Sequence, residues 1–463
     1  MSGAVPESND ADVVVVGAGL SGLRAALELH RSGVSVIVLE SHKHVGGRLR
    51  FFDVDLHGST AKHDVSAAWL NNTTHSEMFS LAKTFGFDLI NQYVSGRFLH
   101  QKKYGSVVSY PLGFGADILH PDVRGFYAML QRLAEAWQGP DRKALDSVTL
   151  KALAEANGDD KQVAGEEADV LAGRLFGTSA VHVSALFVID MIKSTGGLQS
   201  MLSWYGAHYR IRQGVGAFAS CLSSMLPGGS VQLGKEVVSI VQSGPLCYVT
   251  TADNVTLRCK KVIVSVPHTQ YGSIVFHPPL PRAMDALATD TTDGYYATVV
   301  LEFATPWWRE AGLSGSFDSA PGQGPVSVAC DTCSEQDNHY SLTCFVVGET
   351  GRRWSTNGED QRRSEVWGHV RSVFSARVDE ASIPDPIGCV IKEWPQRTMA
   401  VMPPGVLDSE AGEALGKPFG NIHFVGAETS DVWKGYMEGA VRSGIRGANE
   451  VVVALGDSLR SHL

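Results

Sequence analysis

Residues 12–22 read Asp-Val-Val-Val-Val-Gly-Ala-Gly-Leu-Ser-Gly, and this stretch decides the fold of its region. The run of valines predicts a buried strand that enters a turn with the spacing GxGxxG at Gly17, Gly19 and Gly22. Apolar residues at helical spacing follow, a second strand covers residues 34–39, and Glu40 comes directly after it. This order of strand, glycine turn, helix, strand and acid predicts a Rossmann-type βαβ unit that binds a dinucleotide.

The glycine turn places the backbone against phosphate. Gly17 permits the tight turn, Gly19 lets the chain approach a pyrophosphate, and Gly22 lets the helix pack closely on the strand. The helix begins at Leu20 and Ser21, where unpaired N–H groups favour a negative charge. All five residues are therefore expected to bind the cofactor.

The residues after the second strand favour FAD over NAD. Glu40 is placed to accept hydrogen bonds from an adenosine ribose, and its charge disfavours a 2′-phosphate. Residues 45–48 read Val-Gly-Gly-Arg, so Gly47 allows a close backbone approach and Arg48 offers a charged fork to phosphate. A GGR sequence after the acid is typical of FAD-binding flavoproteins.

Composition sets limits on the rest of the chain. Its 463 residues are enough for two domains, and the net charge of -10 argues against nucleic acid as a partner. No apolar run is long enough to cross a bilayer. The seven scattered cysteines, including the CxxC at Cys330 and Cys333, predict ordinary reduced thiols. The sixteen histidines show no metal-binding spacing, so we expect no metal site.

A second nucleotide signal lies near the other end of the chain. Residues 421–431 predict a strand, a glycine turn and an acid, and a helix is expected to open at Val432. Glu428 can accept a hydrogen bond from a ribityl hydroxyl. Backbone N–H groups near Tyr436 and Met437 would point at the flavin C2 carbonyl, where they favour reduction of the ring.

These motifs together resemble the flavin-containing amine oxidase family, of monoamine-oxidase type. The two terminal groups, in this order, are strong evidence: GAGLSG (17–22) and GGR (46–48), then GAETS (426–430) and WKGYMEGAV (433–441). Weaker matches run through the middle: RIRQGVGAF (210–218), KKVIVSVP (260–267), FHPPLP (276–281), PWWRE (306–310) and MPPG (402–405).

The resemblance implies an α/β fold with two discontinuous domains. A Rossmann-type FAD domain would take residues 11–96, 213–297 and 393–463. An α+β substrate domain would take residues 97–212 and 298–392.

The resemblance also implies roles for single residues. The backbone of Val237 would contact the adenine. Residues 62–69 would run under the flavin ring, with small Ala68 permitting close approach and Trp69 forming a wall. Tyr436 and Trp433 would lie at the catalytic face of the ring.

The sequence departs from the family pattern at three places. Arg397 stands where animal monoamine oxidases carry the flavin-linking cysteine, and Cys389 is the closest thiol, so we expect non-covalent FAD. Tyr436 supplies one aromatic wall for the substrate amine, but Thr398 or Met399 stands where the other is usual. Thr298 replaces a lysine that usually holds a water beside flavin N5.

Further pocket walls are expected at Leu202, Tyr209 and Phe187. The implied activity is that of an FAD-dependent amine oxidase, which removes a hydride from the carbon α to the amine nitrogen while O2 becomes H2O2. The departures favour a specialised amine of secondary metabolism, in which the imine is hydrolysed or captured by ring closure. Two alternatives stay open: a flavin dehydrogenase or desaturase acting on a C–C bond, and a non-catalytic binding protein like the Rab GDP-dissociation inhibitors.

The last three residues, Ser461-His462-Leu463, are a close variant of the peroxisomal Ser-Lys-Leu address. They predict a peroxisomal import receptor as a partner and a peroxisomal location, with the cytoplasm as the alternative. A peroxisome would suit an enzyme that makes hydrogen peroxide.

Overall fold

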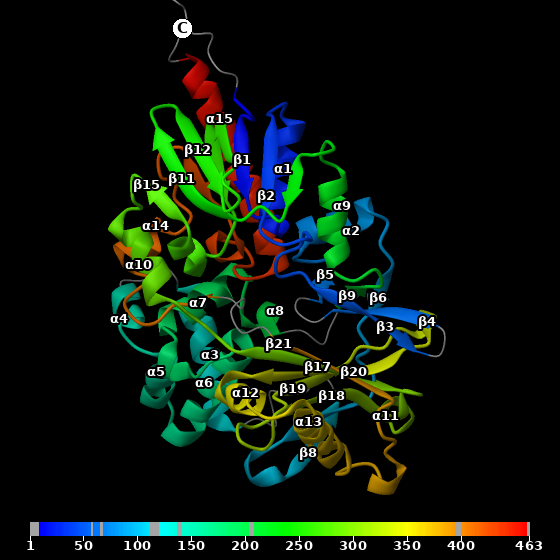
Figure 1. Cartoon of the computed structure of the whole chain (residues 1–463). Coiled ribbons are helices and arrows are strands. Elements are labelled where there is room, and N and C mark those ends of the chain that lie inside the picture. The colour runs from blue at the N-terminus through cyan, green and yellow to red at the C-terminus, as the bar shows by residue number, and fades with distance from the viewer. Residues whose placement is uncertain are drawn as a thin grey trace, which may run out of the picture.

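The structure is a computed structural model, and it describes residues 9–56, 59–64, 68–111, 120–136, 141–202, 208–393 and 400–460. The molecule has an upper half that contains both ends of the described chain and a lower half formed by a large sheet and its helices (Figure 1).

A parallel sheet forms the centre of the upper half. Its strand order is β10-β2-β1-β14-β23, with every neighbouring pair parallel. The strands are β10 (Val231–Leu233), β2 (Val36–Glu40), β1 (Val13–Val16), β14 (Lys261–Val264) and β23 (Ile422–Phe424). Strands from the beginning, the middle and the end of the chain therefore meet in one sheet, and the predicted βαβ unit is confirmed.

Alternate residues of β1 point into two different cores. Val13 and Val15 pack with α1 (Leu20–Arg31), α9 (Gly216–Ser224) and α15 (Met437–Arg460). Val14 and Val16 pack instead toward a second, four-stranded sheet. Both faces of the parallel sheet are covered, as expected for strands that are apolar at every position.

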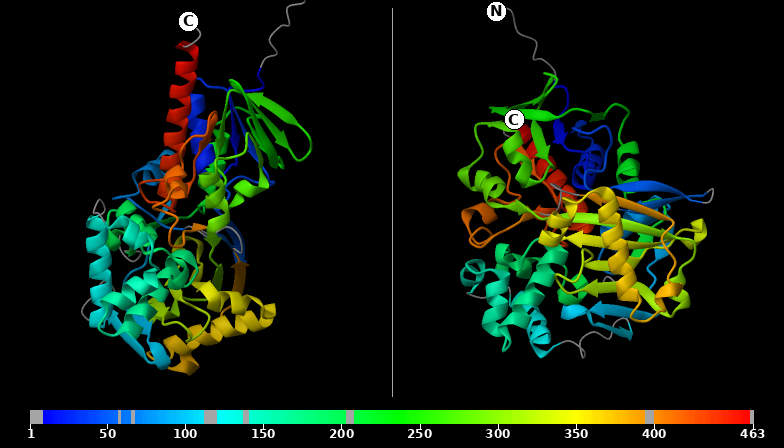
Figure 2. Two further views of the ribbon diagram at one scale, coloured as in Figure 1. Left: turned by 90° about the vertical axis from the view of Figure 1, so that its left-hand side faces the viewer. Right: turned by 60° about the horizontal axis from the view of Figure 1, so that its bottom comes forward.

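Helix α15 lies directly against α1, and a glycine makes this possible. A Cβ atom on Gly444 would stand 2.4 Å from the carbonyl oxygen of Ser21. The close crossing brings the C-terminal helix to the start of the glycine turn, and Figure 2 shows α15 running along the upper half.

The second sheet and several short pairings complete the upper half. Its order is β13-β12-β11-β15, formed by Thr256–Cys259, Leu246–Thr251, Val237–Ser243 and Val275–His277. Smaller sheets join β5 (Leu70–Asn71), β9 (His208–Ile211) and β6 (Leu89–Asn91), then β3 (Phe51–Leu56) with β4 (Ser59–Asp64), and β16 (Thr292–Asp293) with β22 (Ala400–Val401). The remaining helices here are α2 (Ser76–Thr84), α10 (Arg282–Asp290) and α14 (Glu410–Ala414).

The lower half is organised around a seven-stranded sheet. Its order is β21-β17-β20-β19-β18-β7-β8, formed by Gly388–Glu393, Tyr296–Phe303, Tyr340–Val347, Val328–Asp331, Leu313–Ser319, Arg97–Gln101 and Val107–Pro111. Helices α11 (Trp307–Glu310), α12 (Gly348–Ser355) and α13 (Glu359–Phe374) pack on one face through Ala297, Val299, Leu301 and Phe303 of β17. Thr298, Val300 and Glu302 alternate with them, so they point to the opposite face.

A separate group of helices lies to one side of this sheet. It comprises α3 (Pro121–Glu135), α4 (Arg142–Asp146), α5 (Leu150–Asn157), α6 (Lys161–Phe176), α7 (Ala185–Ser194) and α8 (Leu198–Leu202). In the left view of Figure 2 this group and α13 stand on opposite sides of the sheet. Helix α7 is buried along nearly its whole length, as its apolar sequence predicts.

The strands of the parallel sheet all fall inside the ranges predicted for the FAD domain. Strand β9 belongs to the range predicted for the substrate domain, yet it pairs with β5 and β6 of the other half. The division into two domains therefore stays a prediction, and the pairing of β9 crosses its proposed border.

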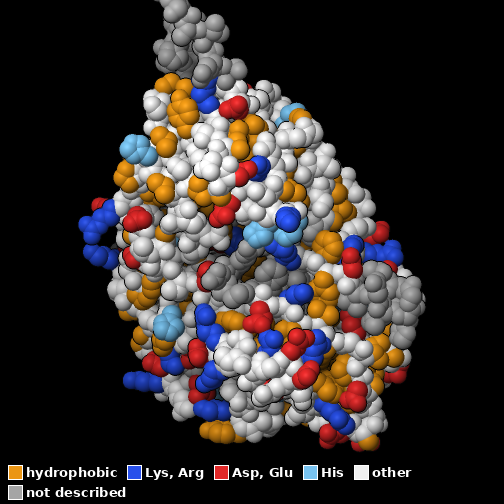
Figure 3. Space-filling view, in the orientation of Figure 1, with side chains coloured by type: hydrophobic (Ala, Val, Ile, Leu, Met, Phe, Trp, Pro, Cys, Tyr) orange, Lys and Arg blue, Asp and Glu red, His pale blue; other side chains and the backbone are white. Residues whose placement is uncertain are grey.

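Neither the charge of the visible surface nor the length of the described helices points to a nucleic-acid or membrane partner. On the face of the molecule drawn in Figure 3, acidic and basic side chains are interspersed over the lower half, and no continuous basic area is seen there. Among the helices of the described ranges, none combines the length and the apolar character that a bilayer crossing requires. All seven cysteines are free thiols, as the sequence predicts.

Candidate active site

The glycine turn has the shape of a phosphate cradle. Gly17 adopts a φ of 101°, and a Cβ on Gly22 would stand 2.2 Å from the carbonyl oxygen of Gly17. A Cβ on Gly19, in contrast, would meet no atom within 4 Å. The first and third glycines are thus required by packing, whereas the second faces open space at the start of α1.

The start of α1 is suited to an anion. Leu20 and Ser21 form the first turn, and no side chain in the described ranges caps the helix there. Gly47 approaches from the next loop, since a Cβ on it would stand 3.3 Å from the Cα of Gly19. Uncapped N–H groups facing open space fit the pyrophosphate of a dinucleotide.

Glu40 is fixed at the end of β2 by backbone donors. Its carboxylate accepts hydrogen bonds from the N–H of Ala18 at 2.8 Å and the N–H of His42 at 2.9 Å. Burial acts to raise the pKa of Glu40, but these bonds outweigh it and hold the pKa below its usual value. The carboxylate therefore stays ionised, as its predicted role as an acceptor for ribose hydroxyls requires.

The segment that leads into Val237 lies beside this acid. The N–H of Lys235 donates to the carbonyl of Glu40 at 2.7 Å, so the entry to β11 meets the end of β2. The pairing of β11 with β12 shifts between Val237 and Ser239. This irregularity interrupts the ladder at the residue expected to contact adenine through its backbone.

Arg48 and Glu428 pair with each other across the cofactor region. Two nitrogens of the guanidinium donate to the two carboxylate oxygens, at 2.5 and 3.0 Å, over a sequence separation of 380 residues. Burial acts to raise the pKa of Glu428, yet the Arg48 charge outweighs it and lowers the pKa. The sequence predicts separate phosphate and ribityl contacts for these residues. The structure adds an ion pair that joins the two terminal motifs.

Trp433, Tyr436 and His75 form a cluster of rings where the isoalloxazine ring of the flavin is expected, and this cluster is called the ring end below. The rings of Trp433 and Tyr436 meet edge to face at 5.0 Å, and His75 meets Trp433 at 4.1 Å. Burial raises the pKa of Tyr436, so its phenol stays neutral. Burial also lowers the pKa of His75 to about 3, so its imidazole is neutral near pH 7. His75 was missed by the sequence analysis because it lies far from Trp433 in the chain.

The loop that carries Trp433 and Tyr436 is held by helix α7. The N–H of Trp433 donates to the carbonyl of Ser194 at 2.8 Å, and the N–H of Lys434 donates to the Ser194 hydroxyl at 3.1 Å. The Lys434 ammonium forms a buried ion pair with Asp190 on the same helix. Helix α7 therefore positions the segment at which the flavin ring is expected.

The helix predicted to open at Val432 begins later, at Met437. Trp433 adopts a left-handed φ of 52°, and the N–H of Gly435 donates back to the carbonyl of Ala427 at 2.9 Å. These contacts replace helical ones, so the prediction of the helix start was wrong. Met437 then lies in the first turn of α15, where its N–H lacks a partner within the helix.

Thr298 and Trp69 meet around one aromatic residue. Thr298 is buried on β17 and is the register partner of Phe345 on β20. The Trp69 ring lies 6.2 Å from the Phe345 ring, and its N–H donates to the side chain of Gln92 at 2.8 Å. Buried Ala68 precedes Trp69. Phe345 and Gln92 are neighbours that the sequence analysis did not identify.

The other three residues expected to line the substrate pocket lie in different surroundings from one another. Leu202 lines an open cavity of about 520 Å³ between α3 and α8, together with Tyr127 and Gln131. Tyr209 packs against Phe79 instead, and Phe187 is fully buried. Trp433, Tyr436, Thr298 and Trp69 do not line this cavity, so it is separate from the ring end. Arg397, Thr398 and Met399 lie outside the described residues.

Comparisons with known proteins agree with this geometry. The model of the family described as flavin-containing amine oxidoreductase matches residues 20–452. Amine oxidase [flavin-containing] B of Homo sapiens is 28% identical, with 97% of this chain and 87% of the relative aligned. Probable flavin-containing monoamine oxidase A of Dictyostelium discoideum is 26% identical over 95% of this chain and 97% of its own length.

Solved structures share the fold. Cyclohexylamine oxidase from Brevibacterium oxydans superposes with a TM-score of 0.86 at 24% identity, over 96% of this chain and 100% of the other. Wild-type putrescine oxidase bound to putrescine gives a TM-score of 0.85 at 24% identity, over 96% and 99%. The predicted α/β fold of the amine-oxidase type is therefore confirmed.

Proposed function

Because this chain belongs to the flavin-containing amine oxidoreductases, we propose that it removes a hydride from the carbon α to an amine nitrogen and that O2 is reduced to H2O2. It is an oxidoreductase acting on C–N bonds, and its cofactor is FAD. When bound, FAD accepts the hydride and passes the two electrons to O2. The amine becomes an imine or iminium. Membership of this family does not support the C–C desaturase or the non-catalytic binding protein.

The observation that carries the proposal is the ring end itself. Trp433 and Tyr436 present perpendicular aromatic faces on a loop that α7 fixes from below. An aromatic face attracts and orients an amine, and a neutral amine is the form that can release hydride. The role of the protein at this site is to position the amine and exclude water.

The three polar side chains proposed for the ring end are uncharged, and the ammonium of neighbouring Lys434 is paired with Asp190. Thr298 carries no charge, and burial keeps the Tyr436 phenol and the His75 imidazole neutral. We therefore propose that no side chain abstracts a proton from carbon and that the nitrogen lone pair drives hydride loss.

We propose a specialised amine rather than a simple monoamine as the substrate. Thr298 stands in place of the usual lysine, and Thr398 or Met399 in place of the second aromatic wall. With Trp433 and Tyr436 on one side and no aromatic residue at positions 398 and 399, the amine is less narrowly framed, which favours a bulkier substrate. Such an amine could place an internal nucleophile near the iminium carbon and close a ring. Hydrolysis to an aldehyde is the competing outcome, and product analysis by mass spectrometry distinguishes the two.

FAD is proposed to bind without a covalent link. Residues 394–405 contain no cysteine. Cys389 on β21 packs into the core beneath the sheet, on the face opposite to Thr298. Acid precipitation should therefore release free FAD into the supernatant, and flavin that stays in the pellet would contradict this.

The decisive experiment mixes the purified protein with a panel of amines without oxygen while the flavin absorbance is followed. We expect bleaching with at least one amine and release of peroxide when air is admitted. Tyr436→Ala should lower kcat/KM by about 100-fold, whereas Tyr436→Phe, which keeps the ring, should stay within about 10-fold of wild type. Both variants should remain yellow. Equal kinetics of Tyr436→Ala and wild type would show that this ring does not face the substrate.

The peroxisomal address at Ser461-His462-Leu463 lies outside the described residues and remains part of the proposal. It is supported by the similarity to Ser-Lys-Leu and by the expected peroxide product. A fluorescent fusion that keeps these residues should enter peroxisomes, and one that lacks them should not.

A further inference from the structure

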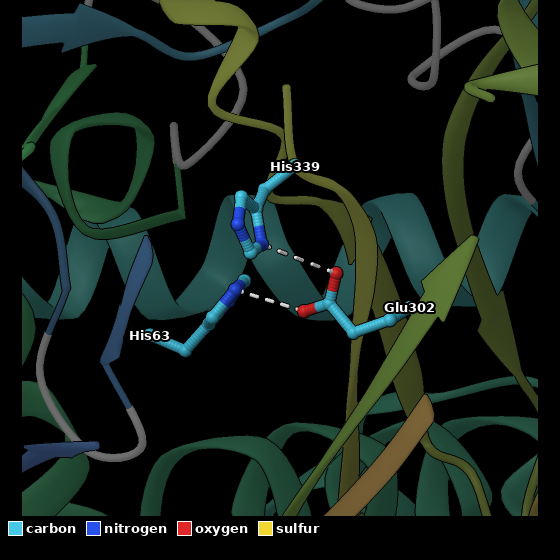
Figure 4. Close-up of side chains that lie close together, drawn as sticks. All are labelled: His63, Glu302 and His339. Atoms are coloured by element: carbon cyan, nitrogen blue, oxygen red, sulfur yellow. Dashed lines mark ion pairs between the residues drawn. The ribbon is translucent and has the colours of Figure 1, made fainter. Parts of the chain in front are cut away.

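Three side chains from distant segments point toward one another beside the large sheet. His63 comes from β4, Glu302 from β17, and His339 from the loop that leads into β20 (Figure 4). The Nε2 atom of His63 lies 2.8 Å from Oε1 of Glu302, and Nδ1 of His339 lies 3.9 Å from Oε2. One ligand atom from each residue falls within 4.8 Å of the other two.

This cluster is removed from solvent. Glu302 is 0% exposed, His339 1% and His63 4%. Neither oxygen of Glu302, nor Nε2 of His63, has a partner in hydrogen-bond geometry among the described residues, despite the short contact between them. An ionised carboxylate in such a place is costly unless it is paired or binds a metal ion.

The loop that carries His339 is ordered before any ligand arrives. The N–H of Ser334 donates to the carbonyl of His339 at 2.8 Å, and the N–H of His339 donates back at 3.0 Å. Asp337 in the same loop pairs with Arg212. On the other side, the His63 ring stacks on Phe52 at 5.8 Å. Both imidazoles are therefore held from neighbouring elements.

We propose that His63, Glu302 and His339 bind one divalent transition-metal ion, with Zn²⁺ as the best match. Two imidazole nitrogens and one carboxylate oxygen are the donors that zinc accepts in proteins, with bonds of about 2.0–2.2 Å. Tetrahedral zinc sets its ligand atoms roughly 3.4 Å apart, which lies between the two measured contacts. Small side-chain rotations complete the site, and a water molecule supplies the fourth ligand.

The site is separate from the amine chemistry. Glu302 lies four residues after Thr298 on the same face of β17, which corresponds to roughly 13 Å along the strand. The metal would instead fasten the hairpin β3–β4 to the large sheet.

Sequence spacing alone predicted no metal site. The three ligands are separated by 239 and 37 positions in the chain, and no motif connects them. Only the pairing of β17 with β20 and the return of the β3–β4 hairpin bring them together.

The test measures zinc and does not use activity. FAD-loaded wild-type protein is stripped with a chelator, exposed to excess Zn²⁺, passed through gel filtration and analysed by plasma mass spectrometry. We expect one tightly bound zinc per chain. Glu302→Gln and His63→Ala should weaken zinc binding by more than about 100-fold, because each removes a direct ligand.

His423→Gln is the matched control. His423 is also buried beside a carboxylate, that of Glu450 at 3.1 Å, but among the described residues no second histidine joins that carboxylate in a metal-binding group. This variant should keep the wild-type zinc content. Wild-type protein that stays free of zinc, or Glu302→Gln protein that binds as much as wild type, overturns the proposal.

Circular dichroism shows whether the variants fold. If they do not, a spectroscopic measurement on the wild-type protein tests the proposal instead. Wild-type protein loaded with Co²⁺ should show the visible bands of a four-coordinate ion, and Zn²⁺ should abolish them. Absence of these bands in folded, yellow protein overturns the proposal equally. Neither result depends on the amine panel, so failure here leaves the oxidase proposal untouched.

Discussion

The dinucleotide end and the ring end of the site differ in how far apart in the chain their residues lie. The cradle of Gly17, Gly19 and Gly22 and its acid Glu40 come from one continuous stretch. At the ring end, Trp433 and Tyr436 meet His75, which comes from a distant segment near the other end of the chain. The first is fixed by local backbone geometry, the second by tertiary contacts.

This contrast explains what holds each end in place. At the cradle, glycines without side chains let the backbone close on itself. At the ring end, the loop 430–436 is fastened to α7 by Ser194 and by the buried pair Lys434–Asp190. Substitutions that disturb the packing of the lower half should therefore displace the ring end more than the glycine cradle.

The largest effect is expected from breaking the fastening of the loop. Lys434→Met leaves the Asp190 carboxylate buried without its partner, which costs about 3–5 kcal/mol of folding free energy. Urea unfolding measures this loss. Lys417→Met removes an exposed pair with Glu413 and should change stability by less than about 0.5 kcal/mol. Equal effects of the two substitutions would show that the buried pair does not hold the loop.

Two glycine substitutions test the cradle. Gly22→Ala forces a Cβ to 2.2 Å from a backbone oxygen and should cost about 1–3 kcal/mol, seen as a lower melting temperature. Gly19→Ala meets no protein atom, so the fold should survive while FAD affinity falls by more than about 10-fold. A yellow Gly19→Ala protein with wild-type affinity would mean that the phosphate does not approach this glycine.

The smallest effect concerns pH at the ring end. Burial lowers the pKa of His75 to about 3, whereas the unfolded chain titrates near pH 6.5. Between pH 3 and pH 6.5, the imidazole of residue 75 is protonated in the unfolded chain but stays neutral in the folded protein. The contribution of His75 to the free energy of unfolding is therefore full above pH 6.5 and is lost as the pH falls toward 3. His75→Phe should remove roughly 1 kcal/mol per pH unit from the slope of stability between pH 6 and 5. Urea unfolding at both pH values gives the slope, and an unchanged slope would contradict the assignment.

The sequence predicts the local half of the site well. Strand β1 matches its predicted residues, and the helix and second strand follow within a few positions, because glycine spacing and apolar periodicity are local signals. Helix α7 and strands β17 and β20 likewise coincide with apolar runs of the sequence.

The prediction fails where tertiary contacts override local pattern. The helix after Val432 starts late because Trp433 takes a left-handed backbone and Ser194 binds the loop. Arg48 meets Glu428, and His63 meets Glu302, across separations that no spacing rule contains. A buried lysine such as Lys434 carries no signal of its partner until α7 is placed.

The parallel sheet also has a consequence for biosynthesis. Strand β23 covers the edge of β14, and α15 covers α1, yet both are translated after residue 421. A nascent chain on the ribosome therefore exposes a bare strand edge and an apolar helix face until almost all of it has been made. Chaperone binding during translation should concentrate on these surfaces, and chains arrested before β23 should aggregate rather than acquire colour.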